Sequence, residues 1–299
     1  MNEQAIYDKI KDIELDRRSG ASQLARKALL VLKFVAQTSG KEALDFLEDF
    51  NNVGRRLLKT RPSMAPIQNL VGCILYEVNA KERGESMHAL RNFIISKVDE
   101  LYRDYELAIQ VASEYGACMI NDFEQVLTCS YSSTVCIAFK LAKRQGKTFD
   151  VLVAESRYDD ERIYHGRLFA KKLEPHRIPT EVFPDDDISS YATRAGKVLV
   201  GADSILADGS LINGIPTHRV ALAAEDNRIP FYTICETMKF NILGYFGRKP
   251  ELEKGFDLTP SKLVTGILTE KGMIEPNKVI EHLRNVERRA KFLKSIFIN

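Results

Sequence analysis

Hydrophobic residues recur at helical spacing in the first third of the chain. In residues 21–36, and again in residues 87–112, an apolar side chain returns every three or four positions, so these side chains share one face of a helix. Residues 41–50 repeat this period, and none of the three stretches alternates as a half-buried strand would. The pattern predicts that residues 1–115 form an all-helical N-terminal domain.

A different pattern begins after Gly116, where short apolar runs alternate with helical stretches. The predicted strands are residues 125–128, 149–154, 179–183, 198–200, 229–234 and 263–268. The predicted helices are residues 134–144, 166–173, 188–194 and 217–225, and a charged helix at 277–296 that we expect to dock on a partner or on the sheet. Strands alternating with helices are typical of a parallel, doubly wound sheet. The chain is therefore predicted to be an α/β protein with a Rossmann-like domain at residues 116–299.

The most informative stretch covers residues 197–240, which we interpret as strand, loop, helix and strand. Asp203 follows the first of these strands, and Glu236 follows the second. A polar segment at residues 207–214 contains two glycines and an asparagine, and we expect it to be a functional loop. Ligands of an open parallel sheet bind beyond the carboxyl ends of its strands. Both carboxylates are therefore candidates for catalysis or ligand binding, with helix capping as the alternative.

Polar residues also follow the other predicted strands. Residues 128–133 are rich in hydroxyl groups, and Arg157 and Arg167 add fixed positive charges. Arginine is suited to bidentate contacts with phosphate. Because the carboxyl ends of parallel strands meet at one edge, these residues are expected to line one crevice. The combination predicts a small phosphorylated ligand, either a sugar phosphate or a nucleoside monophosphate.

Two loops in the helical part carry residues suited to anion binding. Arg18, Gly20 and Ala21 stand immediately before a predicted helix, whose backbone N–H groups could cradle a phosphate. A capped helix start is the simpler interpretation of this turn. Arg61 lies in a proline-containing loop at residues 60–66, and it becomes a phosphate ligand only if the fold places it near an anion.

Composition and charge narrow the classes of function. The net charge of the 299 residues is +2, which gives no reason to expect a nucleic acid or a membrane surface as a partner. Apolar runs fall short of the roughly 20 residues that a membrane span requires. The N-terminus is charged and lacks the apolar core of a signal peptide, so we expect a cytoplasmic protein.

Metal, disulfide and nucleotide-cofactor sites are not expected. The five cysteines form no CxxC pair, and the five histidines lack metal-ligand spacing. His165 and His218 stand near candidate loops, and a structural or solvated role is favoured for both. GxGxxG and P-loop patterns are absent from the sequence.

Several motifs of the chain resemble those of one protein family. The motifs are VLVGADSILADGSLINGIPTHRVALAAEDNRIPFYTICETMKF, ESRYDDERIYHGR, TRPSMAPIQNLV and DRRSGAS. They are similar to sequences in the family that joins the alpha, beta and delta subunits of initiation factor 2B, their archaeal relatives, methylthioribose-1-phosphate isomerase and ribose-1,5-bisphosphate isomerase. The resemblance implies a helical domain on a Rossmann-like domain, and a homodimer.

The resemblance also implies roles for individual residues. In the isomerases, a cysteine after Thr-His and the aspartate of the GAD motif carry the aldose–ketose conversion, and Asp203 matches that aspartate. Cys129 falls at the histidine position and Ser130 at the cysteine position. Gly214 stands where the family usually has a lysine. Further sugar-phosphate contacts are implied for Ser132, Asn213, Glu236 and Lys239.

Two functions remain open from the sequence. The departures at Ser130 and Gly214 favour an initiation-factor-2B-alpha-like protein that binds a sugar phosphate or nucleoside monophosphate with little turnover, and that has possible translation-factor subunits as partners. The alternative is an isomerase of a ribose-1-phosphate-type substrate that uses Cys129 or Ser130 together with Asp203. In an extended segment, the Cys129 and Ser130 side chains should point to opposite sides, which would keep the thiol away from Asp203.

Overall fold

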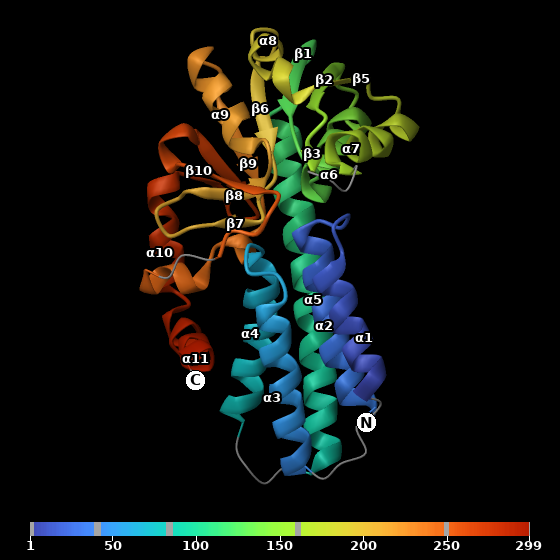
Figure 1. The fold of residues 1–299 in the computed structure, drawn as a ribbon, viewed down its shortest axis with the longest axis vertical. Coiled ribbons are helices and arrows are strands. Elements are labelled where there is room, and N and C mark those ends of the chain that lie inside the picture. Colours follow the sequence, from blue (N-terminus) through green and yellow to red (C-terminus); the bar gives the residue numbers. More distant parts are fainter. Residues whose placement is uncertain (1–2, 39–42, 82–85, 159–162, 248–250, 299) are drawn as a thin grey trace.

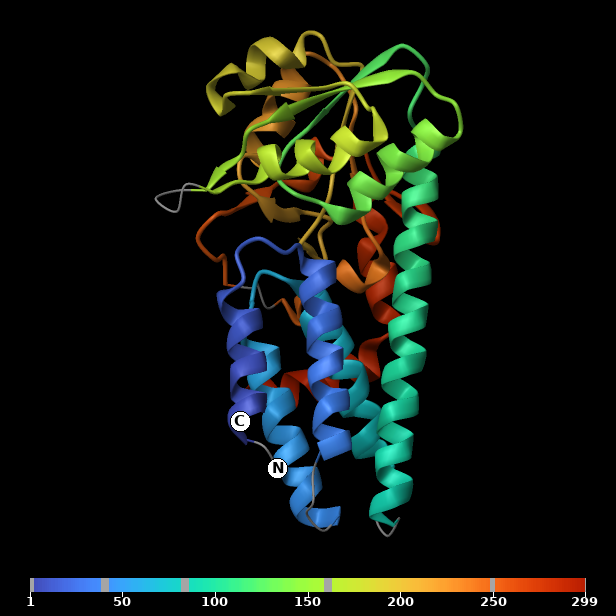
Figure 2. The same ribbon diagram turned by 90° about the vertical axis from the view of Figure 1, so that its right-hand side faces the viewer.

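The computed structural model describes residues 3–38, 43–81, 86–158, 163–247 and 251–298. The chain begins with a bundle of long helices, as the apolar period predicts (Figure 1). Their bounds are α1 (Glu3–Leu15), α2 (Ala21–Thr38), α3 (Ala43–Lys59), α4 (Ala65–Ala80) and α5 (Met87–Cys118). The longest of them, α5, runs along the bundle and continues up to the sheet (Figure 2).

The apolar stripe of α2 shows how the sequence forms this bundle. Leu24, Ala28, Leu32 and Val35 are all completely buried in a core that α1 to α5 share. A stripe of this kind drives helix packing because each buried aliphatic side chain contributes about 1.5–3 kcal/mol. Pro66 lies in the first turn of α4, where its missing N–H costs no helical hydrogen bond.

The second part of the chain is built on a seven-stranded sheet. Its strands are β1 (Glu124–Thr128), β2 (Phe149–Ala154), β5 (Thr180–Phe183), β6 (Lys197–Val200), β9 (Phe231–Ile234), β11 (Gly266–Thr269) and β12 (Gly272–Ile274). Their spatial order is β12-β11-β9-β6-β1-β2-β5, and every pairing is parallel except that of β12 with β11. The strand order reverses between β1 and β6, which is where ligands bind in doubly wound sheets.

Helices cover both faces of this sheet (Figure 1). On one face, α6 (Ser133–Arg144), α7 (His165–Leu173) and the end of α5 share an apolar core. On the other face, α8 (Ile188–Ala192), α9 (Thr217–Asp226) and α10 (Val279–Arg284) share a second core. Short 3-10 helices cover Glu174–His176, Asp185–Asp187, Thr237–Lys239, Ile242–Phe246, Ser261–Leu263 and Pro276–Lys278. The predicted α/β architecture is confirmed.

The polar segment at residues 207–214 differs from the prediction of a loop. It contains β8 (Leu211–Gly214), which pairs antiparallel with β7 (Ser204–Ile205) and with β10 (Phe256–Thr259). Gly209, at φ +81°, makes the turn between β7 and β8. The prediction was wrong because glycine and asparagine indicate turns, whereas the partner strand β10 lies far along the sequence. A further two-stranded ribbon joins β3 (Arg157–Tyr158) to β4 (Ile163–Tyr164).

The predicted C-terminal helix is interrupted. After α10, the chain continues as α11 (Glu287–Ile298), which leaves the sheet and packs on α4 of the bundle (Figure 1). Leu293 is completely buried there, and a Cβ at Gly72 would lie 2.7 Å from its methyl carbons. The expected docking on the sheet holds for α10, whereas α11 completes the core of the helical bundle.

Candidate functional site

A small, partly open cavity lies at the point where the strand order reverses. It lies between the carboxyl ends of β1 and β6 and the bundle end formed by the loops before α2 and α4. Its lining residues are Arg17, Arg18, Ser19, Gly20, Arg61, Met64, Ser130, Tyr131, His165, Asp203, Gly214, Gly255 and Phe256. Both parts of the chain therefore contribute to one site.

Asp203 is the acidic residue of this cavity. Its backbone N–H donates to the Ile212 carbonyl at 2.9 Å, and its carbonyl accepts from the Ala65 N–H at 3.1 Å. The carboxylate accepts the N–H of Ala21, the first residue of α2. Burial raises the pKa of Asp203 to about 6, against the lowering effect of the Lys239 and Arg61 charges. A carboxyl group with this pKa can donate or accept a proton near neutral pH.

The turn before α2 brings Arg18 and Gly20 to the cavity. The Asp16 carboxylate closes this turn by accepting the N–H groups of Arg18 and Ser19, each at 2.9 Å. The first N–H groups of α2 have no partner within the helix, so they are available to a ligand or to a neighbouring side chain. One of them, the N–H of Ala21, contacts Asp203. The turn therefore has the position and the backbone donors expected of an anion cradle.

Arg61 lines the same cavity, although it is only 3% exposed. Its Nε donates to Glu253 Oε1 at 2.7 Å, and its Nη1 donates to the Asp16 carbonyl at 2.6 Å. The Glu253 carboxylate also accepts the N–H of Ser63 at 3.0 Å. A buried arginine held on two sides keeps a fixed charge at the cavity wall, which suits recognition of a phosphate group.

Ser130 reaches the cavity, whereas Cys129 does not line it. Ser130 has φ +61°, and its N–H donates to Ser156 Oγ at 2.7 Å. The Cys129 side chain packs in the core under α9, with its Sγ 3.4 Å from Thr217 Oγ1. Burial raises the pKa of this thiol above its usual range. The two side chains separate as predicted, but a left-handed residue at 130 achieves this rather than an extended segment.

Gly214 leaves room for the Ser130 side chain. A Cβ built at Gly214 would lie 2.3 Å from Ser130 Oγ. Any side chain here, including the lysine that the family pattern usually carries, would require the hydroxyl to move. Gly214 and the Ser130 side chain are therefore immediate neighbours in the cavity wall.

Ser132, which is half-buried, and Asn213, which is buried, lie near the cavity without lining it. Ser132 caps α6 by accepting the Val135 N–H at 3.3 Å. Asn213 Nδ2 donates to Thr217 Oγ1 at 2.9 Å, which joins β8 to the start of α9. Both side chains thus have structural contacts, and a contact of either with a ligand stays a prediction.

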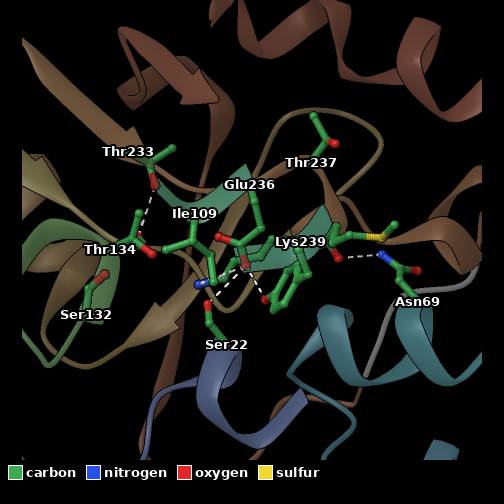
Figure 3. Close-up of polar contacts among 12 residues, drawn as sticks. Ser22, Asn69, Ile109, Ser132, Thr134, Thr233, Glu236, Thr237 and Lys239 are labelled. Carbon is green, nitrogen blue, oxygen red and sulfur yellow. Dashed lines mark hydrogen bonds and ion pairs between the residues drawn. The ribbon is translucent and has the colours of Figure 1, made fainter. Parts of the chain in front are cut away.

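Glu236 and Lys239 form a buried polar group between the sheet and the bundle (Figure 3). Glu236 Oε1 accepts hydrogen bonds from Ser22 Oγ, at 3.0 Å, and from the Tyr105 hydroxyl. Lys239 Nζ lies 3.9 Å from the same oxygen. The Lys239 charge also lowers the pKa of Asp203, so this group is electrostatically linked to the cavity.

The structure does not bring Arg157 and Arg167 to this cavity. Arg157 is exposed, and its backbone N–H donates to Asp185 at 2.9 Å. Arg167 forms an ion pair with Glu155 at 2.8 Å and lies 4.4 Å from the centroid of the Tyr164 ring. It lines a separate surface groove beside β5. Phosphate binding by either arginine stays a prediction.

His165 and Tyr131 line the cavity but were not among the predicted site residues. His165 begins α7, and Gly166 allows that helix start to approach β2, because a Cβ there would lie 2.0 Å from the Ala154 carbonyl oxygen. Tyr131 packs edge-on against Phe169. For His165, the sequence signal that could have indicated the site is Gly166, which follows it directly at a junction between a strand and a helix.

Within residues 3–38, 43–81, 86–158, 163–247 and 251–298, no group of three or more His, Cys, Asp or Glu side chains is arranged to hold a metal ion. The same ranges contain no helix that is both long and apolar enough to cross a membrane.

Comparisons with known proteins find relatives that match most of the length of the chain. Residues 17–254 match the Initiation factor 2 subunit family. Ribose 1,5-bisphosphate isomerase from Thermococcus kodakarensis is 30% identical, over 93% of this chain and 92% of that protein. A putative translation initiation factor eIF-2B subunit 2-like protein from Pyrococcus horikoshii is also 30% identical, over 92% and 98%. The crystal structure of the Pyrococcus horikoshii translation initiation factor eIF-2B superimposes with a TM-score of 0.80 at 29% identity, over 92% and 98% of the two chains.

Proposed function

Because this chain belongs to the initiation factor 2 subunit family, we propose that it is an aldose–ketose isomerase of sugar phosphates, with ribose 1,5-bisphosphate as the substrate type. The resemblance inferred from the motifs is confirmed. The sequence departures favoured a binding protein over an isomerase, whereas relatives named as ribose 1,5-bisphosphate isomerases give the isomerase alternative the better support.

The observation that carries the proposal is the placement of Asp203. Its carboxyl group has a pKa of about 6 and lines a cavity at the reversal of strand order. Arg18, Gly20 and Arg61 line the same cavity and supply charge and backbone donors for a phosphate. A proton-transfer group and an anion site within one cavity are what isomerisation of a sugar phosphate requires.

The reaction needs a proton carrier at carbon two and another that assists ring opening. We assign one of these roles to Asp203. Ser130 and His165 line the cavity as candidates for the other. An aliphatic hydroxyl needs a strong base beside it, whereas an imidazole ring has one nitrogen that donates and one that accepts a proton, so His165 is the stronger candidate on chemical grounds.

Turnover of ribose 1,5-bisphosphate tests the proposal. Purified protein is incubated with the aldose, and ketose formation is followed by ¹³C NMR. Asp203→Asn should reduce the rate by about 100-fold or more, the scale of a lost general acid–base. Asp226→Asn, at an exposed position at the end of α9, is the matched control and should retain activity. Wild-type protein that binds the substrate but forms no ketose would refute the isomerase proposal.

A second candidate is a sugar-phosphate or nucleoside-monophosphate binding protein of initiation factor 2B alpha type, with translation-factor subunits as partners. The observation that favours it is the burial of Cys129 away from the cavity, which leaves a serine at the family's cysteine position. The 30% identity to an eIF-2B subunit 2-like protein is consistent with it. Calorimetric binding of ribose 1,5-bisphosphate or AMP without turnover is the expected result in that case.

We also propose that the protein is a cytoplasmic homodimer that associates through the sheet domain. Leu222 and Met273 are large apolar side chains of that domain that are 43% and 62% exposed, and a second copy would cover such surface. Light scattering at micromolar concentration should give twice the chain mass of 33.9 kDa. A stable monomer would contradict the proposal.

A further inference from the structure

Two serines lie just beyond neighbouring strands and share an unusual backbone conformation. Strand β1 ends at Thr128 and β2 ends at Ala154, and the two strands pair in parallel. Ser130 and Ser156 stand at equivalent positions after these ends, with φ of +61° and +52°. A left-handed backbone costs free energy in any residue that has a Cβ. Two such residues at adjacent strand ends therefore indicate that specific contacts hold them there.

The Ser156 hydroxyl joins the two strand ends. It is completely buried, accepts the N–H of Ser130 at 2.7 Å and donates to the Ala154 carbonyl at 3.0 Å. A serine hydroxyl can donate one hydrogen bond while it accepts others, so it is suited to bridge an N–H and a carbonyl. The bridge ties Ser130, which lines the cavity, to the end of β2.

The backbone carbonyl of Ser156 holds a second residue of the cavity wall. It accepts the N–H of His165 at 3.1 Å, and the neighbouring Glu155 carbonyl accepts the N–H of Gly166 at 3.0 Å. These two bonds fix the start of α7, where His165 lines the cavity. Ser130 and His165 come from different βα junctions, yet one is bonded to the hydroxyl of Ser156 and the other to its carbonyl.

Asp185 holds Ser156 from the side away from the cavity. It lies in the 3-10 helix that follows β5. Its Oδ1 accepts the N–H of Ser156 at 2.8 Å, and its Oδ2 accepts the N–H of Arg157 at 2.9 Å. Hydrogen bonds to a charged acceptor are among the stronger ones, and two bonds to successive N–H groups restrain the backbone between them. Asp185 therefore anchors the left-handed turn at Ser156.

We propose that Ser156 is a positioning residue that places Ser130 and His165 at the cavity wall for proton transfer. The inference rests on the proposed function, in which these two side chains are the candidates for the second proton carrier. Proton transfer requires heavy atoms about 2.6–3.2 Å apart, and a misplacement of about 1 Å can reduce a rate about 100-fold. Ser156 acts through its neighbours, because neither it nor Asp185 lines the cavity.

Ser156→Gly removes the hydroxyl while the left-handed conformation stays accessible, since glycine adopts positive φ readily. The Ser130 amide loses its acceptor, so its hydrogen exchange should become about 5- to 10-fold faster, the scale of one hydrogen bond. The kcat for ribose 1,5-bisphosphate should fall about 10- to 100-fold. KM should stay unchanged, because Arg18 and Arg61 keep their places at the cavity.

Asp185→Ala tests the anchor of the turn. Loss of both carboxylate oxygens frees the backbone of Ser156, so the amides of Ser130 and His165 should both exchange about 5- to 10-fold faster. The kcat should again fall with KM unchanged. Asp187→Ala is the matched control, because Asp187 is an exposed aspartate of the same 3-10 helix. It should keep the exchange rates and the kcat of the wild type.

Exchange is measured by mass spectrometry, with electron-transfer fragmentation to resolve single amides. Ser156→Ala also lacks the hydroxyl, and it provides a second variant should Ser156→Gly fold poorly. Ser86→Ala is the control for both, because the Ser86 hydroxyl likewise accepts a backbone N–H, at the end of α5 far from the sheet (Figure 2). General destabilisation would speed exchange throughout the chain, whereas loss of positioning should speed it at the named amides.

The outcomes separate the contacts of Ser156 from the reaction. Faster exchange at Ser130 with a lower kcat and an unchanged KM, absent from Ser86→Ala, would support the positioning role. Exchange at Ser130 that equals the control in both Ser156 variants would overturn it. Faster exchange with an unchanged kcat would show that Ser156 holds the wall without serving the reaction. Wild-type protein that forms no ketose would overturn the proposed function, and faster exchange would then still support the restraint of the wall by Ser156.

Discussion

Replacement of the cavity aspartate should make the protein more stable at high pH and leave it nearly unchanged at low pH. Asp203 has a pKa raised from 3.8 to about 6 because burial disfavours its charged form. The unfolded chain therefore releases this proton more readily than the folded protein. Below pH 3.8 the carboxyl is mostly protonated in both states, so no buried charge destabilises the folded protein and its full stability is present. It is lost as the pH rises through about 6.

The size of the effect follows from this difference in pKa. At about 1.4 kcal/mol per pKa unit, folding with a charged Asp203 costs about 3 kcal/mol at pH 8. At pH 4 the same linkage leaves a cost of only about 0.6 kcal/mol, because most of the folded protein is protonated. Asp203→Asn removes the titrating group, so its stability relative to wild type should increase by about 2.4 kcal/mol between pH 4 and pH 8.

Urea unfolding followed by circular dichroism at pH 4, 5, 6, 7 and 8 measures this difference. Comparing the pH dependence cancels any constant effect of the amide on packing. Asp226→Asn, at an exposed position on α9, should show the same pH dependence as the wild type. A difference between Asp203→Asn and wild type that stays constant from pH 4 to pH 8 would show that the Asp203 pKa is not raised in the folded protein.

Three further predictions follow from contacts described above. Ser130→Cys places a thiol at the cavity and should increase ketose formation by about 100-fold at neutral pH, as measured by NMR, because a thiol ionises far more readily than a hydroxyl. Asp16→Asn should lower the free energy of unfolding by about 1 kcal/mol at pH 7. Burial favours a higher pKa for Asp16, but hydrogen bonds from Lys27 and from the turn hold that pKa well below its usual value. The loss of free energy of unfolding in Asp16→Asn should therefore shrink as the pH falls below about 4. A loss that is the same at every pH would contradict this prediction. Leu293→Ala should destabilise the protein by about 2–5 kcal/mol in thermal unfolding, and an unchanged melting temperature would contradict the packing of α11 on α4.

Periodicity predicted most elements because each depends on neighbours that are close in sequence. The apolar stripe of α2 and the buried run of β2 carry their own signal, and both formed where predicted. Asp203 could be predicted as a site residue because a position directly after a strand lies at the ligand-binding edge of any open parallel sheet. These inferences needed no knowledge of which distant segments meet.

The sequence was less informative where a residue's role depends on a distant partner. Arg157 and Arg167 have the chemistry of phosphate ligands, but the chain bends at β3 and α7 so that Arg167 pairs with Glu155 outside the cavity. Tyr105 lies on an ordinary helical period, and only the meeting of α5 with the turn after β9 gives its hydroxyl a carboxylate partner. Such contacts join residues widely separated in sequence, and local patterns carry no signal for them.

The return of α11 to the bundle has a consequence for how the protein is made. Ala290 and Leu293 are completely buried in the same apolar core as Leu24 and Leu32 of α2. During synthesis, the N-terminal helices leave the ribosome long before α11 is made, so one apolar side of the bundle stays uncovered in the meantime. Contacts between such distant segments slow folding, since a long loop must close before they form. The growing chain is therefore open to aggregation or chaperone binding at this surface until α11 has been synthesised.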